Sequence, residues 1–303
     1  MWIDKLHKAF VSNWLLLIAV IFVYIFYKIG GSWDEPEVVA SVAVQVGTAL
    51  FLMQLNHIFT FIRTRTLLPA LIYLLLTLNV DVSDKCLIES LITFIVALNL
   101  LFLFRSYQAP QSQGNSFNIA VILTIGSLFW QPLLFLFLVF WTGFYRFQSL
   151  TRKVFLASIV GFLTVYLFLF AWFVYADDLK AFVLFLPSKE LFMPQLIMPD
   201  IFTLLIMGLT GAVLVWEGYN LFITGLSETV KTVQILNYLY IALIIIFVCA
   251  FLKSTLQPQW EMLLSIPASM LLAHFFSLTD NKLVKYAMPA YFILIVTLGF
   301  MKS

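Results

Sequence analysis

The sequence predicts an all-α fold, a polytopic transmembrane helical bundle, and three observations support this prediction. Of the 303 residues, 63% are hydrophobic and only 11% are charged, whereas about a quarter of the residues of a globular protein are charged. Apolar runs that are long enough for membrane helices recur along the whole chain. Alternating strand patterns are absent, and a bilayer favours helices because they satisfy their own backbone hydrogen bonds. We therefore expect a single integral membrane domain over residues 1–303.

About 11 spans are predicted, with nine as the lower limit. The first apolar run follows Lys5 and Lys8 and ends at Tyr27-Lys28 rather than at a cleavage site of small residues, so we expect a retained span. The predicted spans cover residues 11–27, 38–60, 67–80, 87–104, 117–130, 133–145, 154–175, 201–223, 235–252, 260–276 and 286–301.

The segment 117–145, interrupted by Gln131-Pro132, decides the span count. One kinked helix would place Arg105 and Arg146 on opposite sides of the membrane, whereas two short helices keep them on the same side. Because basic residues collect in cytoplasmic connections, the sequence favours the hairpin. Each of its helices would cover only about 20 Å of a hydrocarbon core of about 30 Å. Such helices must be shielded by protein or must thin the bilayer locally.

Lysine and arginine placement predicts a cytoplasmic N-terminus. With this orientation every arginine lies on the inside. The basic residues expected inside are Lys5, Lys8, Arg63, Arg65, Arg105, Arg146, Arg152, Lys153, Lys231, Lys282 and Lys285.

Several function classes receive no support from the sequence. The net charge is +2 and the basic residues are scattered between spans, so nucleic-acid binding is not indicated. Cys86 and Cys249 are far apart, and the three histidines are also well separated, so neither a disulfide framework nor a metal site is expected. No motif identifies a cofactor or a protein partner.

Two sets of charged residues are candidates for chemistry. Asp34 and Glu35 follow the first span and could act as a catalytic base on an acceptor hydroxyl; the alternative is a solvated loop. A second set could bind a lipid phosphate at the cytoplasmic surface, because guanidinium groups suit phosphate geometry, or could determine topology alone. Its members are Arg63, Arg65, Arg105 and Arg146.

Glu217 interrupts the apolar run 201–223. An acidic residue at membrane depth is costly and suggests a proton relay, an ion site or a partner for a buried cation. Trp216 and Tyr219 are also compatible with an interfacial position at which Glu217 reaches water. Glu89 is expected to reach water near the outer end of its span. Polar residues within or at the ends of spans are expected to form interhelical hydrogen bonds; these are Gln45, Asn79 and Asn99.

The chain also resembles two known families. An uncharacterised family of multi-pass membrane proteins common in Bacteroidota resembles this chain over about residues 40–175 and implies no activity. The resemblance rests on Leu55-Asn56-His57, Arg63-Thr64-Arg65, Leu68-Pro69-Ala70-Leu71-Ile72-Tyr73, Asn115, Asn118 and Leu128-Phe129-Trp130-Gln131-Pro132.

The pattern Asn118…Leu128-Phe129-Trp130-Gln131-Pro132 and the paired short helices also resemble the C-type membrane glycosyltransferases. Those enzymes use polyprenyl-phosphate sugars and place an acidic residue in the first outside loop, which corresponds here to Asp34 and Glu35. This chain lacks the large outside domain of many members of that family.

We therefore predict a role in the handling of cell-envelope glycans or lipid-linked precursors, with membrane lipids and a polyprenyl-phosphate-linked substrate as partners. Two rival functions are transport, with Glu217 as the coupling site, and a structural subunit of an envelope complex.

Overall fold

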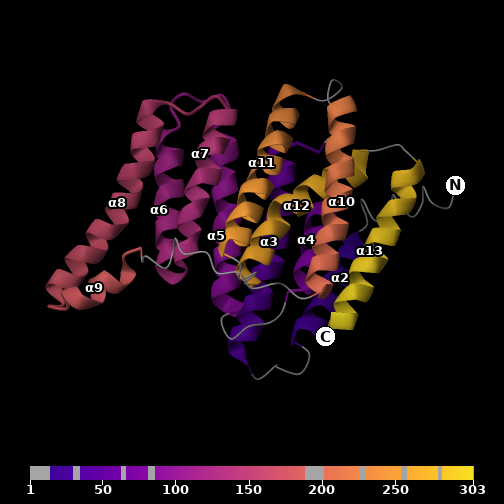
Figure 1. The fold of residues 1–303 in the computed structure, drawn as a ribbon, viewed down its shortest axis with the longest axis horizontal. Helices are drawn as coiled ribbons and strands as arrows, with labels where there is room; N and C mark the ends of the chain where they lie inside the picture. The colour runs from indigo at the N-terminus through magenta and orange to yellow at the C-terminus, as the bar shows by residue number, and fades with distance from the viewer. Residues whose placement is uncertain are drawn as a thin grey trace.

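A computed structural model describes residues 14–29, 35–62, 66–80, 86–187, 201–224, 229–253, 258–278 and 282–302. These residues form helices and no strands, so the predicted all-α class is confirmed for the described ranges (Figure 1). Each predicted span coincides with a helix, and a short helix, α9, was not predicted. The helices are α2 (Trp14–Ile29), α3 (Pro36–Phe59), α4 (Leu68–Leu78), α5 (Cys86–Arg105), α6 (Gln113–Phe129), η1 (Gln131–Phe135), α7 (Leu136–Arg146), α8 (Arg152–Tyr175), α9 (Leu179–Phe185), α10 (Ile201–Thr224), α11 (Val230–Lys253), α12 (Pro258–Leu278) and α13 (Lys282–Lys302).

Among the described residues, five helices are long and apolar enough to cross a membrane. These lie in α3, α5, α8, α10 and α11, over Pro36–Phe59, Cys86–Arg105, Arg152–Tyr175, Ile201–Leu221 and Val230–Phe251. Shorter apolar helices occupy parts of α2, α4 and α13. The chain thus has the helices of a membrane protein, and the count of about 11 spans remains a prediction.

The predicted hairpin at Gln131-Pro132 is confirmed as a feature of the fold. Trp130 has an extended backbone (φ −146°, ψ 97°) that ends α6, and η1 then leads into α7. The backbone N–H of Gln108, just after α5, donates to the carbonyl oxygen of Phe147, just after α7, at 3.0 Å. The two helices therefore finish at the same end of the bundle, which a single kinked helix from residue 117 to 145 could not achieve.

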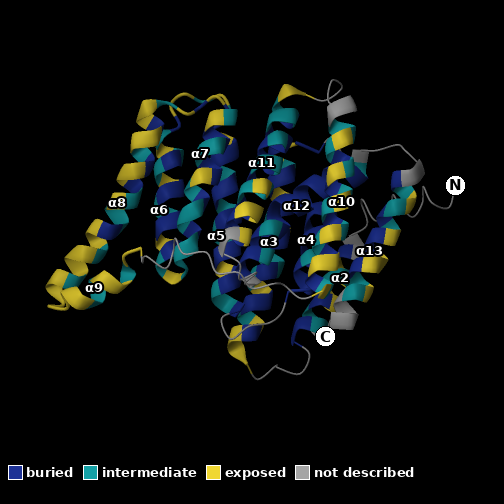
Figure 2. Cartoon of the chain, viewed as in Figure 1, coloured by how far each residue is buried: buried dark blue, intermediate teal, exposed yellow. Residues whose placement is uncertain are grey.

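The short helix α4 lies in the interior of the bundle. Ten of its 11 residues are buried, and its neighbours are α2, α3, α12 and α13. Its 11 residues cover only about 16 Å, about half of a hydrocarbon core, so protein rather than lipid surrounds it, as expected for a short helix. Figure 2 shows the contrast between this buried centre and the exposed surfaces of α8 and α9.

The two ends of the bundle differ in charge. We call the end where α5, α7, α10 and α12 finish and where α8, α11 and α13 begin the basic end; its connections lie along the top of Figure 1. The described arginines all lie there, namely Arg105, Arg146 and Arg152. The described acidic residues near the opposite end are Glu35, Glu37, Glu89, Asp177, Asp178 and Glu261. The described arginines and most of the described acidic residues therefore lie at opposite ends of the bundle.

The polar residues within spans behave differently from one another. Gln45 is confirmed as an interhelical partner: its side-chain amide nitrogen donates to Ser90 Oγ at 2.9 Å, and its amide oxygen accepts from Tyr24. Asn99 is fully buried, and its amide atoms have no hydrogen-bond partner in the described ranges. The prediction that Glu89 reaches water is wrong, since Glu89 is 1% exposed and accepts from Gln259 of α12 at 2.9 Å.

Single-cysteine labelling tests the hairpin in a membrane. Cysteines introduced at the exposed positions Pro110 and Leu150 are expected to react with an impermeant thiol reagent from the same side, and a cysteine at Gln131 from the opposite side. Native Cys86 and Cys249 are buried and can both be replaced by alanine to remove background. Labelling of positions 110 and 150 from opposite sides would contradict the fold.

Candidate functional site

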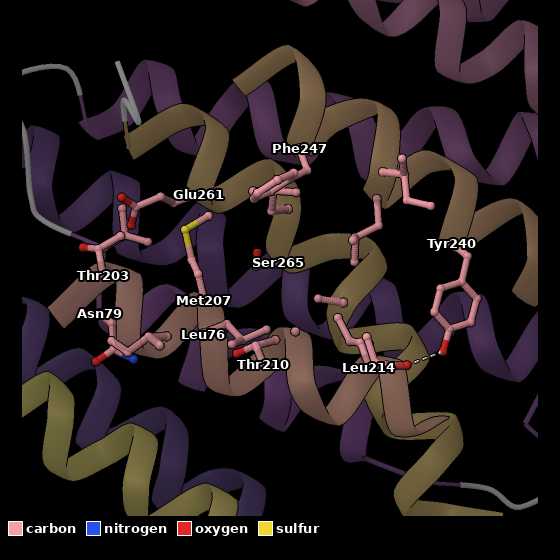
Figure 3. Close-up of a pocket in the computed structure, with 18 of the residues that line it drawn as sticks. Leu76, Asn79, Thr203, Met207, Thr210, Leu214, Tyr240, Phe247, Glu261 and Ser265 are labelled. Atoms are coloured by element: carbon pink, nitrogen blue, oxygen red, sulfur yellow. Dashed lines mark hydrogen bonds between the residues drawn. The ribbon is translucent and has the colours of Figure 1, made fainter. Parts of the chain in front are cut away.

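A cavity of about 450 Å³ lies among α4, α10, α11 and α12, within the usual size range of small-ligand pockets, about 300–1,000 Å³. The helix α12 lies between α10 and α11 and contacts both of them. Figure 3 shows most of the lining side chains, which are predominantly apolar. The lining residues are Leu76, Asn79, Val80, Thr203, Ile206, Met207, Thr210, Gly211, Leu214, Val215, Gly218, Tyr240, Leu243, Ile244, Phe247, Glu261, Leu264, Ser265 and Ala268.

The cavity is elongated along the bundle. On α10 it extends from Thr203 to Gly218, a distance of about 23 Å at the helical rise, which is most of the thickness of a hydrocarbon core. Asn79, Thr203 and Glu261 gather at one end, and Tyr240 lies at the other end, nearer the basic end of the bundle (Figure 3). The cavity thus has a mostly apolar middle, which also contains Thr210 and Ser265, and polar side chains at both ends.

The rim of the cavity reaches the side of the bundle. Val215 on α10 and both Ile244 and Phe247 on α11 line the cavity, yet they are 75%, 57% and 48% exposed. These residues lie within apolar helices long enough to cross a membrane. In a bilayer the opening between α10 and α11 therefore faces lipid rather than water.

Glu217 lies directly behind the Tyr240 end of the cavity. It is only 2% exposed, so of the two positions that the sequence left open, contact with interfacial water is wrong and burial is correct. Glu217 Oε2 accepts a hydrogen bond of 2.6 Å from the Tyr240 hydroxyl. Its other oxygen, Oε1, lies 3.4 Å from Nδ1 of His274 on α12.

His274 and Tyr240 were not singled out by the sequence as partners of Glu217. Tyr240 carries no signal in the sequence, and His274 was expected to lie toward the cytoplasmic side, far along the chain from the other histidines. One signal was available: His274 and Glu217 are both expected near the cytoplasmic ends of their spans, so they lie at a similar depth. The helix rotations that bring them together depend on tertiary packing and cannot be read from the sequence.

The other predicted site residues that the structure describes, Glu35, Arg105 and Arg146, do not line this cavity. Asp34, Arg63 and Arg65 lie outside the described residues. Glu35 is exposed at the start of α3, and its side chain does not cap the helix. Arg105 and Arg146 end α5 and α7, which the bond between Gln108 and Phe147 holds together. Neither arginine lines the cavity.

Metal binding is not indicated by the described part of the chain. No group of three or more histidine, cysteine, aspartate or glutamate side chains is placed there to hold a metal ion.

Comparisons with known proteins do not identify a relative, since no family model, no curated protein and no solved structure matches the chain.

Proposed function

We propose that the protein binds a lipid-linked substrate of the cell envelope and holds its apolar chain in the cavity between α10 and α11. The observation that carries this proposal is the shape of the cavity, about 450 Å³ along most of the bilayer thickness with a rim on the lipid-facing side. A lipid chain can enter such a site sideways without crossing water. The proposed orientation has the N-terminus and the basic end on the cytoplasmic side of a bacterial inner membrane.

The polar end formed by Asn79, Thr203 and Glu261 is the proposed position of the head group. Amide, hydroxyl and carboxylate oxygens accept hydrogen bonds from sugar hydroxyls. Lys28 reaches the same end, because its ammonium group donates to the carbonyl oxygen of Val80, which lines the cavity. These groups support a glycan-bearing lipid as the substrate class.

Filling the cavity tests this proposal. A photoreactive polyprenyl phosphate and a photoreactive phospholipid are each incorporated into vesicles containing the protein, and crosslinked residues are identified by mass spectrometry. Gly211 lines the cavity and a Cβ there meets no atom within 4 Å. We expect Gly211→Phe to reduce crosslinking of cavity residues by about tenfold or more, equivalent to about 1.4 kcal/mol of binding free energy.

Gly208→Phe is the matched control. Gly208 lies on the same helix, is exposed, and does not line the cavity, so this variant should label like the wild type. Strong labelling by the polyprenyl phosphate alone would identify the lipid-linked precursor, whereas equal labelling by both probes would indicate binding of ordinary membrane lipid. Equal labelling of both glycine variants would overturn the proposal.

Transport is the second candidate, and the burial of Glu217 favours it. A buried acid within a spanning helix is a common coupling site in transporters. Glycosyl transfer with Asp34 or Glu35 as the base stays a sequence-based hypothesis, and so does phosphate binding by the four arginines. A non-catalytic envelope subunit would require neither the cavity nor these acids, and cavity variants would then leave its assembly unchanged.

A further inference from the structure

The buried cluster of Glu217, His274 and Tyr240 contains polar atoms that have no hydrogen-bond partner among the described residues. Glu217 is 2% exposed and His274 is 7% exposed. Glu217 Oε1 and both ring nitrogens of His274 have no hydrogen-bond partner in the described part of the chain. The 3.4 Å separation of Oε1 and Nδ1 leaves room for a proton to be held by either residue after a small rotation of the side chains.

Charge balance limits the states that this pair can adopt. With one proton between them, the pair is neutral overall, either as carboxylate and imidazolium or as carboxylic acid and imidazole. Removing that proton leaves an anion, and adding a second leaves a cation, and either charge is costly inside a membrane. The pair therefore strongly favours holding a single proton until another charge arrives nearby.

Tyr240 connects this pair to the cavity. Its hydroxyl has one hydrogen and two acceptors within reach, Glu217 Oε2 at 2.6 Å and the carbonyl oxygen of Leu214 at 3.0 Å. Tyr240 also lines the cavity, whereas Glu217 and His274 do not. A ligand or water in the cavity can therefore exchange a proton with Glu217 through the Tyr240 hydroxyl.

We propose that Glu217 and His274 form a buried proton-binding site that exchanges with the cavity through Tyr240. In the transfer step, a hydronium ion in the cavity gives a proton to the Tyr240 oxygen and becomes water, while the Tyr240 proton passes to Glu217 Oε2. The pair thereby changes from carboxylate and imidazole, which is an anion, to carboxylic acid and imidazole, which is neutral overall. Rotation of the carboxyl group then allows this proton to move to His274 Nδ1. One proton leaves the cavity and one is gained by the pair, and Tyr240 ends with its original proton number.

Among the residues that the structure describes, few other titratable groups lie on the helices around the site. Tyr240 comes from α11 and His274 from α12, while α10 itself places Tyr219 on an exposed surface. From α13, Tyr291 shares a hydrogen bond with Thr210 at 3.2 Å, and Lys285 lies in the first turn at the basic end. This proposal does not depend on which molecule fills the cavity.

The test uses the full chain in lipid nanodiscs without added substrate. Because the chain has three histidines, replacing His7 and His57 by asparagine leaves His274 as the only source of ¹⁵N-histidine signals. We expect the imidazolium signal and the infrared band of the Glu217 carboxyl to change together as the pH is varied. Glu217→Gln should abolish that band and reduce the imidazolium population at neutral pH by about tenfold or more.

Tyr240→Phe separates exchange from pairing. It should leave the coupled transition of Glu217 and His274 intact but slow hydrogen–deuterium exchange of the carboxyl by about tenfold or more. Glu37→Gln, an exposed acid at the opposite end of the bundle, should change neither signal. Independent titration of Glu217 and His274, a histidine signal insensitive to Glu217→Gln, or normal exchange in Tyr240→Phe would each overturn the proposal. These spectra are recorded without ligand, so failure of lipid binding would leave them unchanged.

Discussion

Replacement of His274 by leucine is expected to lower the free energy of unfolding by about 3–5 kcal/mol, because it leaves Glu217 buried beside an apolar side chain. Glu217 is 2% exposed, and His274 Nδ1 is its nearest basic group at 3.4 Å among the described residues. Protonation of Glu217 would relieve part of the penalty, so the loss of stability should be smaller in acidic buffer. Denaturant unfolding in detergent micelles, followed by tryptophan fluorescence, measures the change.

The double variant Glu217→Leu/His274→Leu is the informative control. Replacing both members of a buried pair with apolar residues is often neutral or stabilising, whereas removing one member is costly. We therefore expect the double variant to be more stable than His274→Leu alone, even though one of the two acceptors of the Tyr240 hydroxyl is lost. A double variant with a loss equal to the sum of the two single losses would show that the residues do not interact.

Replacement of Trp260 by alanine is expected to lower the free energy of unfolding by about 3–5 kcal/mol. Trp260 is fully buried in the first turn of α12. Its ring meets that of Trp130 edge-on with 4.8 Å between the centroids. Trp260 thus links the tip of the hairpin to α12, and its truncation would leave a cavity between them. The change in thermal unfolding temperature in micelles measures the effect.

Two substitutions test the cause of that loss. The indole N–H of Trp260 has no hydrogen-bond partner in the described structure, so Trp260→Phe loses no hydrogen bond and should be milder than Trp260→Ala. Trp172→Ala removes an indole that is 65% exposed on α8 and should have little effect on the unfolding temperature. Similar losses for Trp172→Ala and Trp260→Ala would refute the packing argument.

Much of the fold could be predicted from the apolar runs in the sequence and from the residues that interrupt or flank them. Apolar runs located the helices, and Gln131-Pro132 together with the distribution of Arg105 and Arg146 indicated a hairpin. These predictions succeeded because hydrophobicity, proline geometry and charge asymmetry act locally or on single helices. The short helix α9 was not predicted, since its seven residues are too few to give a clear periodic signal.

The candidate site was predicted only in part. Glu217 was recognised because a charged residue within an apolar run is unusual whatever surrounds it. Glu89 was misplaced because its position near a helix end gave no information about Gln259, which lies on a helix far away in the sequence. The cavity was not predicted, because its lining comes from four helices that are separated along the chain.

The sequence by itself therefore determined the class of the protein, the positions of its helices and the charge difference between its ends. Each of these properties follows from the transfer free energy of residues that are close together in the chain. Only the tertiary structure decided that Glu217 is buried, that it meets His274 and Tyr240, and that a lipid-facing cavity lies beside them. Those features depend on the rotation and spacing of packed helices, which side-chain interlocking sets and which no local pattern encodes.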